Sequence, residues 1–307
     1  MFAKHRRRLS RLAILPLTIA ACGHAPPAAP PPRPAIAAPA PPPQEAPGVT
    51  VLDAGVEPRT RLTYAIPVGS AQSFEMTVDM RMDMGSMGGV MTLPRLAMTG
   101  DVAIAASPAP ASVAYTLTTR RLEFIDRPGA AMPASAINAK LGGVQHMVAT
   151  GTLAPTGKVS NFAIDAHEAS ADVVQSLSGL RQSYDQMVTQ FPVAPLGVGG
   201  RWQIVADIDQ NGMKAKQTAT FEVVSITGTS VVLHNHVVLD APSQTIVANG
   251  VQAELRSMKA TGDAAVTVDR TRLLGPTTLT MHLVEELEAM GQSLTMAMDM
   301  DMAMSPK

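Results

Sequence analysis

The feature that most constrains the fold of this 307-residue chain is a strict alternation of apolar and polar residues from position 74 to position 84. Successive side chains of a β-strand point to opposite faces, so this spacing predicts a strand with one apolar and one polar face. Asp79 and Asp83 fall on the polar side, where we expect them to be solvated. Similar stretches predict further strands at 96–104, 113–117, 202–208, 213–223, 231–239, 251–260, 263–270, 277–289 and 293–304.

The segments between these strands are short and contain glycine, which favours antiparallel pairing. Asn211-Gly212 separates two of the strands and is typical of a two-residue hairpin turn. Strands joined by such turns follow one another across a sheet, so the sequence predicts an antiparallel meander. Two similar strand starts, Ile66-Pro67-Val68-Gly69 and Leu196-Gly197-Val198-Gly199, leave open an internal duplication.

The stretch from 165 to 191 has the spacing of a helix. Its apolar residues lie three or four positions apart, which places them along one side of a helix. Asp165 and Glu168 have the spacing of an N-terminal cap, and Pro192 prevents continuation. The apolar side includes Leu177, Leu180 and Tyr184. The predicted fold class is therefore α+β, mainly β: a curved antiparallel meander, or half-barrel, with one long amphipathic helix, about 165–191, packed on its concave face.

The N-terminus has the features of a signal peptide spanning residues 1–21. A basic segment precedes the apolar residues 12–21, which are too few to span a bilayer as a helix. The single cysteine of the chain follows, and Ile19-Ala20-Ala21-Cys22 resembles the lipobox of bacterial lipoproteins. The resemblance implies removal of residues 1–21 and a lipid anchor at Cys22 that attaches the protein to a membrane of the cell envelope. The alternative is an ordinary signal peptide with a coincidental cysteine.

The residues after Cys22 predict an anchored linker and then a folded domain. Gly23 stands where an aspartate would retain an enterobacterial lipoprotein in the inner membrane, so the resemblance implies the outer membrane, facing the periplasm. Positions 25–47 contain 11 prolines in 23 residues, which favours an extended, semi-rigid spacer. The predicted organisation is a signal peptide at 1–21, a lipidated Pro/Ala-rich linker at 22–48 and a β-rich domain at 49–307.

One resemblance covers roughly residues 60–240. The methionine-rich first strand, the turn from Gly151-Thr152 to Gly157, the predicted helix and the run Pro195-Leu196-Gly197-Val198-Gly199-Gly200-Arg201-Trp202 resemble a family of uncharacterised bacterial lipoproteins. Members of that family carry Pro, then Val-x-Val-Gly-Asp-x-Trp, and this chain has Gly200 in place of the acid. The resemblance implies a fold similar to the half-barrel of periplasmic lipoprotein carriers such as LolA. It implies no activity.

Methionine is the residue type that most suggests a function, because 20 occur and many alternate along predicted strands. The candidates for the apolar face are Met76, Met80, Met82, Met84, Met98, Met296, Met298 and Met300. Flexible thioethers fill irregular cores and also line adaptable binding surfaces for acyl chains or other apolar ligands. Thioethers are also soft ligands for Cu(I), so a copper-handling protein is an alternative. A purely structural envelope lipoprotein is a further alternative.

Other chemistry finds little support in the sequence. No nucleophile elbow, zinc-protease helix, phosphate-binding loop or dinucleotide fingerprint occurs, so we expect no enzyme and no cofactor. His234 and His236 share one face of a strand but lack an assignable third metal ligand, so no metal site is predicted. Glu285, Glu286 and Glu288 are expected to be solvated. Beyond Cys22 the chain is acidic and poor in aromatics, which argues against nucleic acid as a partner. The leading hypothesis is a non-enzymatic envelope lipoprotein that binds or shields an apolar ligand or docks a partner.

Overall fold

The computed structural model of the protein describes residues 45–85, 88–139, 147–165, 188–210, 213–248, 251–289 and 292–307. The chain divides into two units, residues 1–42 and residues 43–307, and all described residues belong to the second. The predicted signal peptide, Cys22 and most of the predicted linker lie outside the described residues.

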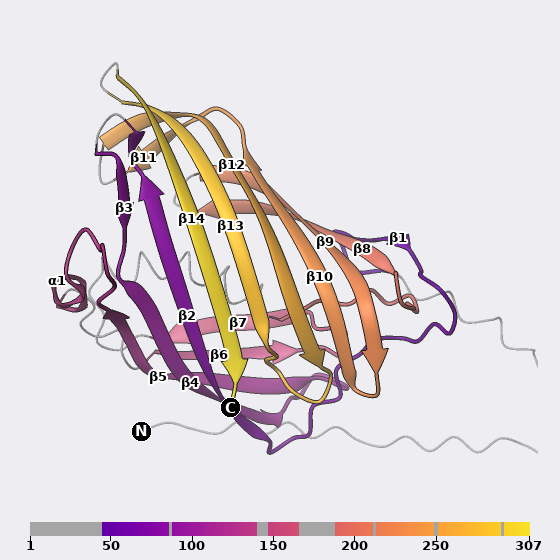
Figure 1. Ribbon diagram of the computed structural model, residues 1–307. Coiled ribbons are helices and arrows are strands. Elements are labelled where there is room, and N and C mark those ends of the chain that lie inside the picture. Colours follow the sequence, from indigo (N-terminus) through magenta and orange to yellow (C-terminus); the bar gives the residue numbers. More distant parts are fainter. Residues whose placement is uncertain are drawn as a thin grey trace, which may run out of the picture. The chain divides into compact units, whose positions relative to one another are not determined.

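Fourteen strands form one antiparallel sheet in the described part of the second unit (Figure 1). They are β1 (Val49–Asp53), β2 (Ala71–Asp83), β3 (Val90–Thr92), β4 (Arg95–Ala106), β5 (Val113–Ile125), β6 (Val148–Leu153), β7 (Val159–Asp165), β8 (Arg201–Gln210), β9 (Met213–Thr227), β10 (Ser230–Ala241), β11 (Gln244–Ala248), β12 (Val251–Asp269), β13 (Thr277–Ala289) and β14 (Gln292–Pro306). A five-residue helix, α1 (Ala134–Asn138), follows β5.

The sheet consists of two meanders joined by its C-terminal strand. Its order is β1-β8-β9-β10-β12-β13-β14-β2-β4-β5-β6-β7, with β11 paired to β12 and β3 paired to β2. The β14–β2 pair places Met304 opposite Met76 and so links the two halves of the chain. The sheet is open, because β1 and β7 stand at its two ends. Figure 1 shows the strands curving, with β6 and β7 crossing behind the lower part of β13 and β14.

The predicted fold class is wrong, because the described chain is nearly all antiparallel strand and holds no helix of seven residues or more. Asp165, expected to cap the long helix, ends β7 and pairs with Val148 of β6, so its backbone is committed to a strand ladder. Residues 166–187, which include Leu177, Leu180 and Tyr184, lie outside the described residues. Among the residues that are described, no helix is long and apolar enough to cross a membrane.

The predicted antiparallel sheet is confirmed, although β1, β3, β6, β7 and β11 were not among the predicted strands and β12 differs from its prediction. Gly262 was expected to separate two strands, at 251–260 and 263–270. Instead β12 runs through it, and Gly262 pairs with Val237 on one side and with Met281 on the other. Pairing on both sides holds the backbone extended, which outweighs the tendency of glycine to turn.

Two equivalent turns lead into the first long strand of each half. Gly69 donates a backbone hydrogen bond to Ile104 of β4, and Gly199 donates one to Val223 of β9. Both glycines have positive φ, 86° and 76°, a conformation that other residues adopt only with strain. Gly200 follows, and a Cβ there would lie 2.8 Å from the carbonyl oxygen of Gly197. The lipoprotein pattern has an aspartate at the position of Gly200. In this chain the backbone around Gly200 leaves no room for such a side chain.

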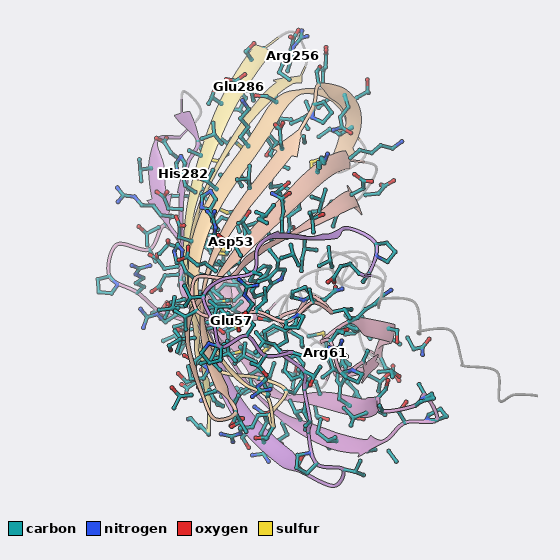
Figure 2. The ribbon with its side chains drawn as sticks, turned by 90° about the vertical axis from the view of Figure 1, so that its right-hand side faces the viewer. Asp53, Glu57, Arg61, Arg256, His282 and Glu286 are labelled. Carbon is teal, nitrogen blue, oxygen red and sulfur yellow. The ribbon has the colours of Figure 1, made fainter. Side chains whose placement is uncertain are left out.

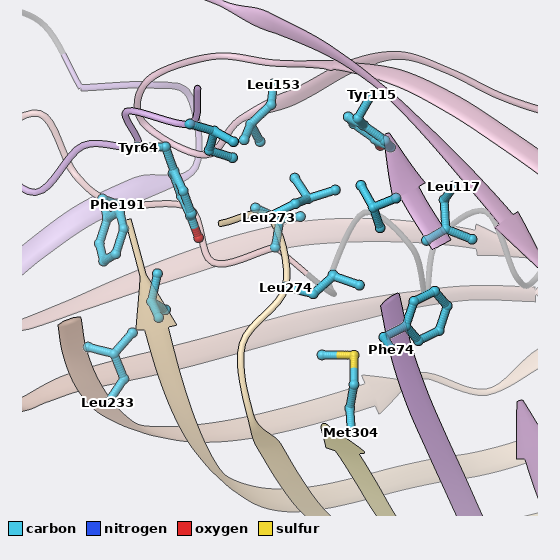
Figure 3. Packing of buried hydrophobic residues seen from close by; sticks show 14 of the residues in the cluster. Tyr64, Phe74, Tyr115, Leu117, Leu153, Phe191, Leu233, Leu273, Leu274 and Met304 are labelled. Atoms are coloured by element: carbon cyan, nitrogen blue, oxygen red, sulfur yellow. The ribbon is translucent and has the colours of Figure 1, made fainter. Parts of the chain in front are cut away.

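The main core lies on one side of the sheet, which we call the core-side face; the opposite side is the outer face. Trp202 is fully buried and stacks on Phe221, with ring centroids 4.9 Å apart and planes 9° from parallel. Its indole Nε1 donates a hydrogen bond to the carbonyl oxygen of Gln190 at 3.0 Å. Figure 3 shows Met304 among the same buried residues as Phe74 and Leu274. The last long strand thus contributes to the same core as the first.

Candidate functional site

The predicted methionines lie on the core-side face and stand opposite one another on neighbouring strands. Directly paired residues of antiparallel strands project to the same side of the sheet. Met281, Met300 and Met80 form one row across β13, β14 and β2. The methionine face comprises Met76, Met80, Met82, Met91, Met98, Met258, Met281, Met296, Met298, Met300, Met302 and Met304. Met84 follows β2 and continues its alternation.

Burial changes along the methionine face. Met98 and Met304 are each only 4% exposed and belong to the main core. Met82, Met298 and Met300 lie farther along the same strands and remain partly exposed. The face therefore passes from the main core, across an apolar surface that retains access to solvent, to a second buried cluster that contains Met258 and Leu255. This accessible part is the candidate functional site.

A single carboxylate lies within this apolar surface. Glu285 of β13 stands opposite Met258 of β12 and Met296 of β14. Leu283 and Leu287 precede and follow it on the same face of β13. The expectation that Glu285 is solvated is wrong: it is half-buried, and all four neighbours on its face are apolar. The strand period places it there, because apolar residues at 281, 283 and 287 have the same parity.

In the part of the chain that the structure describes, Glu285 has no partner for its charge. Within the described residues no hydrogen bond or ion pair reaches its carboxylate, and the pKa of Glu285 is raised by burial alone. The other two acids of this segment, Glu286 and Glu288, are on the outer face. The hydroxyl of Ser257 lies 3.3 Å from Glu286, and Arg256 forms an ion pair with Glu288 at 2.5 Å. Figure 2 shows Arg256 and Glu286 near each other at the upper end of the sheet.

The outer face carries rows of charged residues that neutralise one another. Arg95 donates two hydrogen bonds to Asp79, at 2.9 and 2.6 Å, and Arg127 lies 3.2 Å from the same carboxylate. Chiefly through the hydrogen bonds from Arg95, the pKa of Asp79 is held below its usual value. His282 Nδ1 lies 2.6 Å from Asp299 on the next strand. A shallow depression follows these rows across β2, β12, β13 and β14.

The two histidines of β10 also lie on the outer face, beside one carboxylate. His236 Nδ1 is 2.9 Å from Asp263 Oδ1, and His234 Nε2 is 3.7 Å from the same oxygen. All three side chains are about half exposed. Across the described ranges, no three His, Cys, Asp or Glu side chains are arranged to hold a metal ion. The three side chains form a surface ion-pair cluster.

Comparison with known proteins assigns neither a family nor a function to the chain. No model of a protein family matches the chain, and no curated protein sequence matches it significantly. The likeness to bacterial lipoproteins therefore stays a prediction that rests on the motifs quoted above. The methionine face, with Glu285 inside it, is the arrangement from which a function can be argued.

Proposed function

We propose that the protein is a non-enzymatic envelope lipoprotein, anchored through Cys22, whose methionine face binds an apolar ligand. The observation that carries the proposal is the partial exposure of Met80, Met82, Met298 and Met300 on adjoining strands. Apolar side chains gathered on one surface and left accessible to solvent are typical of a binding surface. Unbranched thioethers adapt to ligands of irregular shape.

The predicted anchor and linker are consistent with a ligand-binding domain in the cell envelope. The lipobox resemblance and Gly23 support attachment to the outer membrane on its periplasmic side. The Pro/Ala-rich spacer, at about 3.1 Å per residue, would hold the domain away from the lipid surface. In this arrangement the methionine face would shield an apolar molecule from the aqueous periplasm.

Copper handling is the second candidate, and one observation favours it. Met281, Met300 and Met80 lie in one row on three adjacent strands, so their three thioethers project from neighbouring positions of one face. Cu(I) accepts such soft ligands. The two candidates use the same side chains, so the test must separate apolar contact from sulfur ligation.

The test measures binding of the uncharged fluorescent probe N-phenyl-1-naphthylamine to the domain. Replacing Met281 and Met300 by glutamine keeps side-chain length but makes the face polar, and we expect binding to weaken by about tenfold or more. The matched control replaces Thr280 and Asp301, their chain neighbours on the outer face, and should bind as the wild type does. Equal binding by all three proteins would overturn the proposal.

A parallel titration with Cu(I) addresses the alternative. Leucine at positions 80, 82, 298 and 300 keeps the face apolar and removes four sulfur atoms. Apolar ligand binding predicts that this variant retains the probe. Copper handling predicts stoichiometric Cu(I) binding by the wild type and its loss in the variant.

A further inference from the structure

Glu285 is a charged residue that lies among apolar side chains of the methionine face. Its neighbours on that face are Met258, Met296, Leu283 and Leu287, and none of them can neutralise a carboxylate. Placing a charge among apolar groups costs free energy unless the charge is paired. The structure therefore contains a negative group whose partner is missing from the described chain.

The place of Glu285 on the face adds a second observation. The row that contains Leu279 and Met302 adjoins the buried end of the face, and the row of Glu285 lies six residues farther along β13. At about 3.3 Å per residue, roughly 20 Å of apolar surface separates the two rows. The surface thus has a charged end and a long uncharged part.

We infer that the ligand of the methionine face is a cationic amphiphile, an apolar chain whose ammonium group pairs with Glu285. This inference rests on the proposed function and adds the charge of the ligand. An ammonium group at Glu285 would donate hydrogen bonds to the unpartnered carboxylate, and the chain would lie over the methionines. A fatty acid in the same position would bring two carboxylates together and would be repelled.

The outer face offers a contrast that supports this choice of charge. There each acid discussed above has a polar partner within the chain: Arg95 for Asp79, Arg256 for Glu288 and Ser257 for Glu286. Glu285 comes from the same strand as the last two and is the one of the three acids of this segment that faces the methionines. Among the three acids of this segment, Glu285 is therefore the one that lacks a polar partner within the described residues.

The experiment compares three ligands with the same chain and different head groups: dodecylammonium, dodecanol and dodecanoate. Each displaces N-phenyl-1-naphthylamine from the wild type, from Glu285→Gln and from Glu286→Gln. We expect dodecylammonium to bind the wild type about tenfold more tightly than dodecanol, the ratio typical of one charged hydrogen bond, with dodecanoate weakest. Glu285→Gln should abolish that preference while keeping dodecanol binding, and Glu286→Gln, on the outer face, should preserve it.

The outcomes separate the two proposals. Binding of dodecanol with no preference for dodecylammonium would overturn the inference about charge and leave the proposed function intact. A preference for dodecylammonium that persists in Glu285→Gln would also overturn it, because the charge would then be recognised elsewhere. Failure of all three ligands to displace the probe would overturn the proposed function itself.

Discussion

The side chain of Glu45 accepts a hydrogen bond from the backbone amide of Val193 at 2.7 Å, across 148 positions of sequence. Its second oxygen accepts one from Ala194 at 2.8 Å. Glu45 lies near the end of the predicted linker 22–48, so these two hydrogen bonds attach the end of that segment to the domain. This contact fixes the point from which the chain leaves the fold.

Replacing Glu45 by alanine should therefore destabilise the domain. Two backbone amides would lose a charged acceptor, and we expect a loss of about 1–3 kcal/mol in the free energy of unfolding. Urea unfolding measures it. Glu222→Ala, at an exposed position of β9, is the control and should change stability by less than about 0.5 kcal/mol. Identical midpoints for both variants would show that the Glu45 contact contributes nothing.

Gly100 of β4 is expected to tolerate no side chain. A Cβ there would lie 2.6 Å from the ring of Phe74, which is buried, and 2.7 Å from the carbonyl oxygen of Thr118. Gly100→Ala should cost about 1–3 kcal/mol through overpacking. Gly88→Ala is the matched control, because the nearest atom to its Cβ would be 3.6 Å away. A thermal unfolding comparison in which both variants match the wild type would contradict the packing described here.

Asp79 should make the protein less stable in acid. Its pKa is lowered in the folded state, chiefly by the hydrogen bonds from Arg95, so the folded protein binds this proton less readily than the unfolded chain. The resulting stabilisation is present above the pKa of an unfolded aspartate and is lost as the pH falls through the folded value. Asp79→Asn should remove this part of the pH dependence in urea unfolding between neutral pH and pH about 3. An unchanged slope would mean that the ion pair with Arg95 does not form in solution.

Glu285 should have the opposite effect on the pH dependence of stability: it should make the protein less stable as the pH rises. Its pKa is raised by burial, so the folded state holds the proton more readily than the unfolded state does. Stability is greatest below the unfolded pKa and falls as the pH rises through the folded value. At neutral pH Glu285→Gln should be more stable than the wild type, by about 0.5–1 kcal/mol for a half-buried unpaired group. If unfolding measurements show the variant to be less stable at neutral pH, the carboxylate has a partner.

The lipid anchor is tested by Cys22→Ala. Without the thiol no diacylglycerol can be attached, so we expect the protein either to appear in the soluble periplasmic fraction or to retain its leader. Fractionation followed by mass measurement distinguishes these results from the wild type. A variant that still matures and still sediments with membranes would refute the lipobox prediction.

The strands could be predicted because the alternation of apolar and polar residues, with a period of two, can be read from the sequence alone. The alternation at 74–84 correctly places Met76, Met80 and Met82 on one face. It does not reveal that Met300 stands opposite Met80, because the β14–β2 register depends on residues more than two hundred positions apart. Sequence spacing is local, whereas pairing between the halves is decided by the whole sheet.

Two errors have physical causes that can be named. Asp165 fits a helix cap by local spacing, but its backbone joins a ladder with β6, and ladder pairing is a tertiary effect. Glu285 was assigned to solvent by residue type, although its parity with Met281, Leu283 and Leu287 already placed it on the apolar face. The prediction relied on the charge of glutamate, whereas the position of Glu285 in the strand gave the correct face.

The pairing of β14 with β2 also has a consequence for the order in which the chain folds. Within each meander, strands that are close in sequence pair with each other and can form early. The pairing of β14 with β2, which places Met304 opposite Met76, must instead close a very long loop. Until the final strand is available, β2 and β13 each lack a partner along one edge, and unpaired edges recruit other chains. A chain synthesised from the N-terminus must therefore protect two incomplete sheets until β14 is available, so the pairing of β14 is the step that commits the molecule to its folded form.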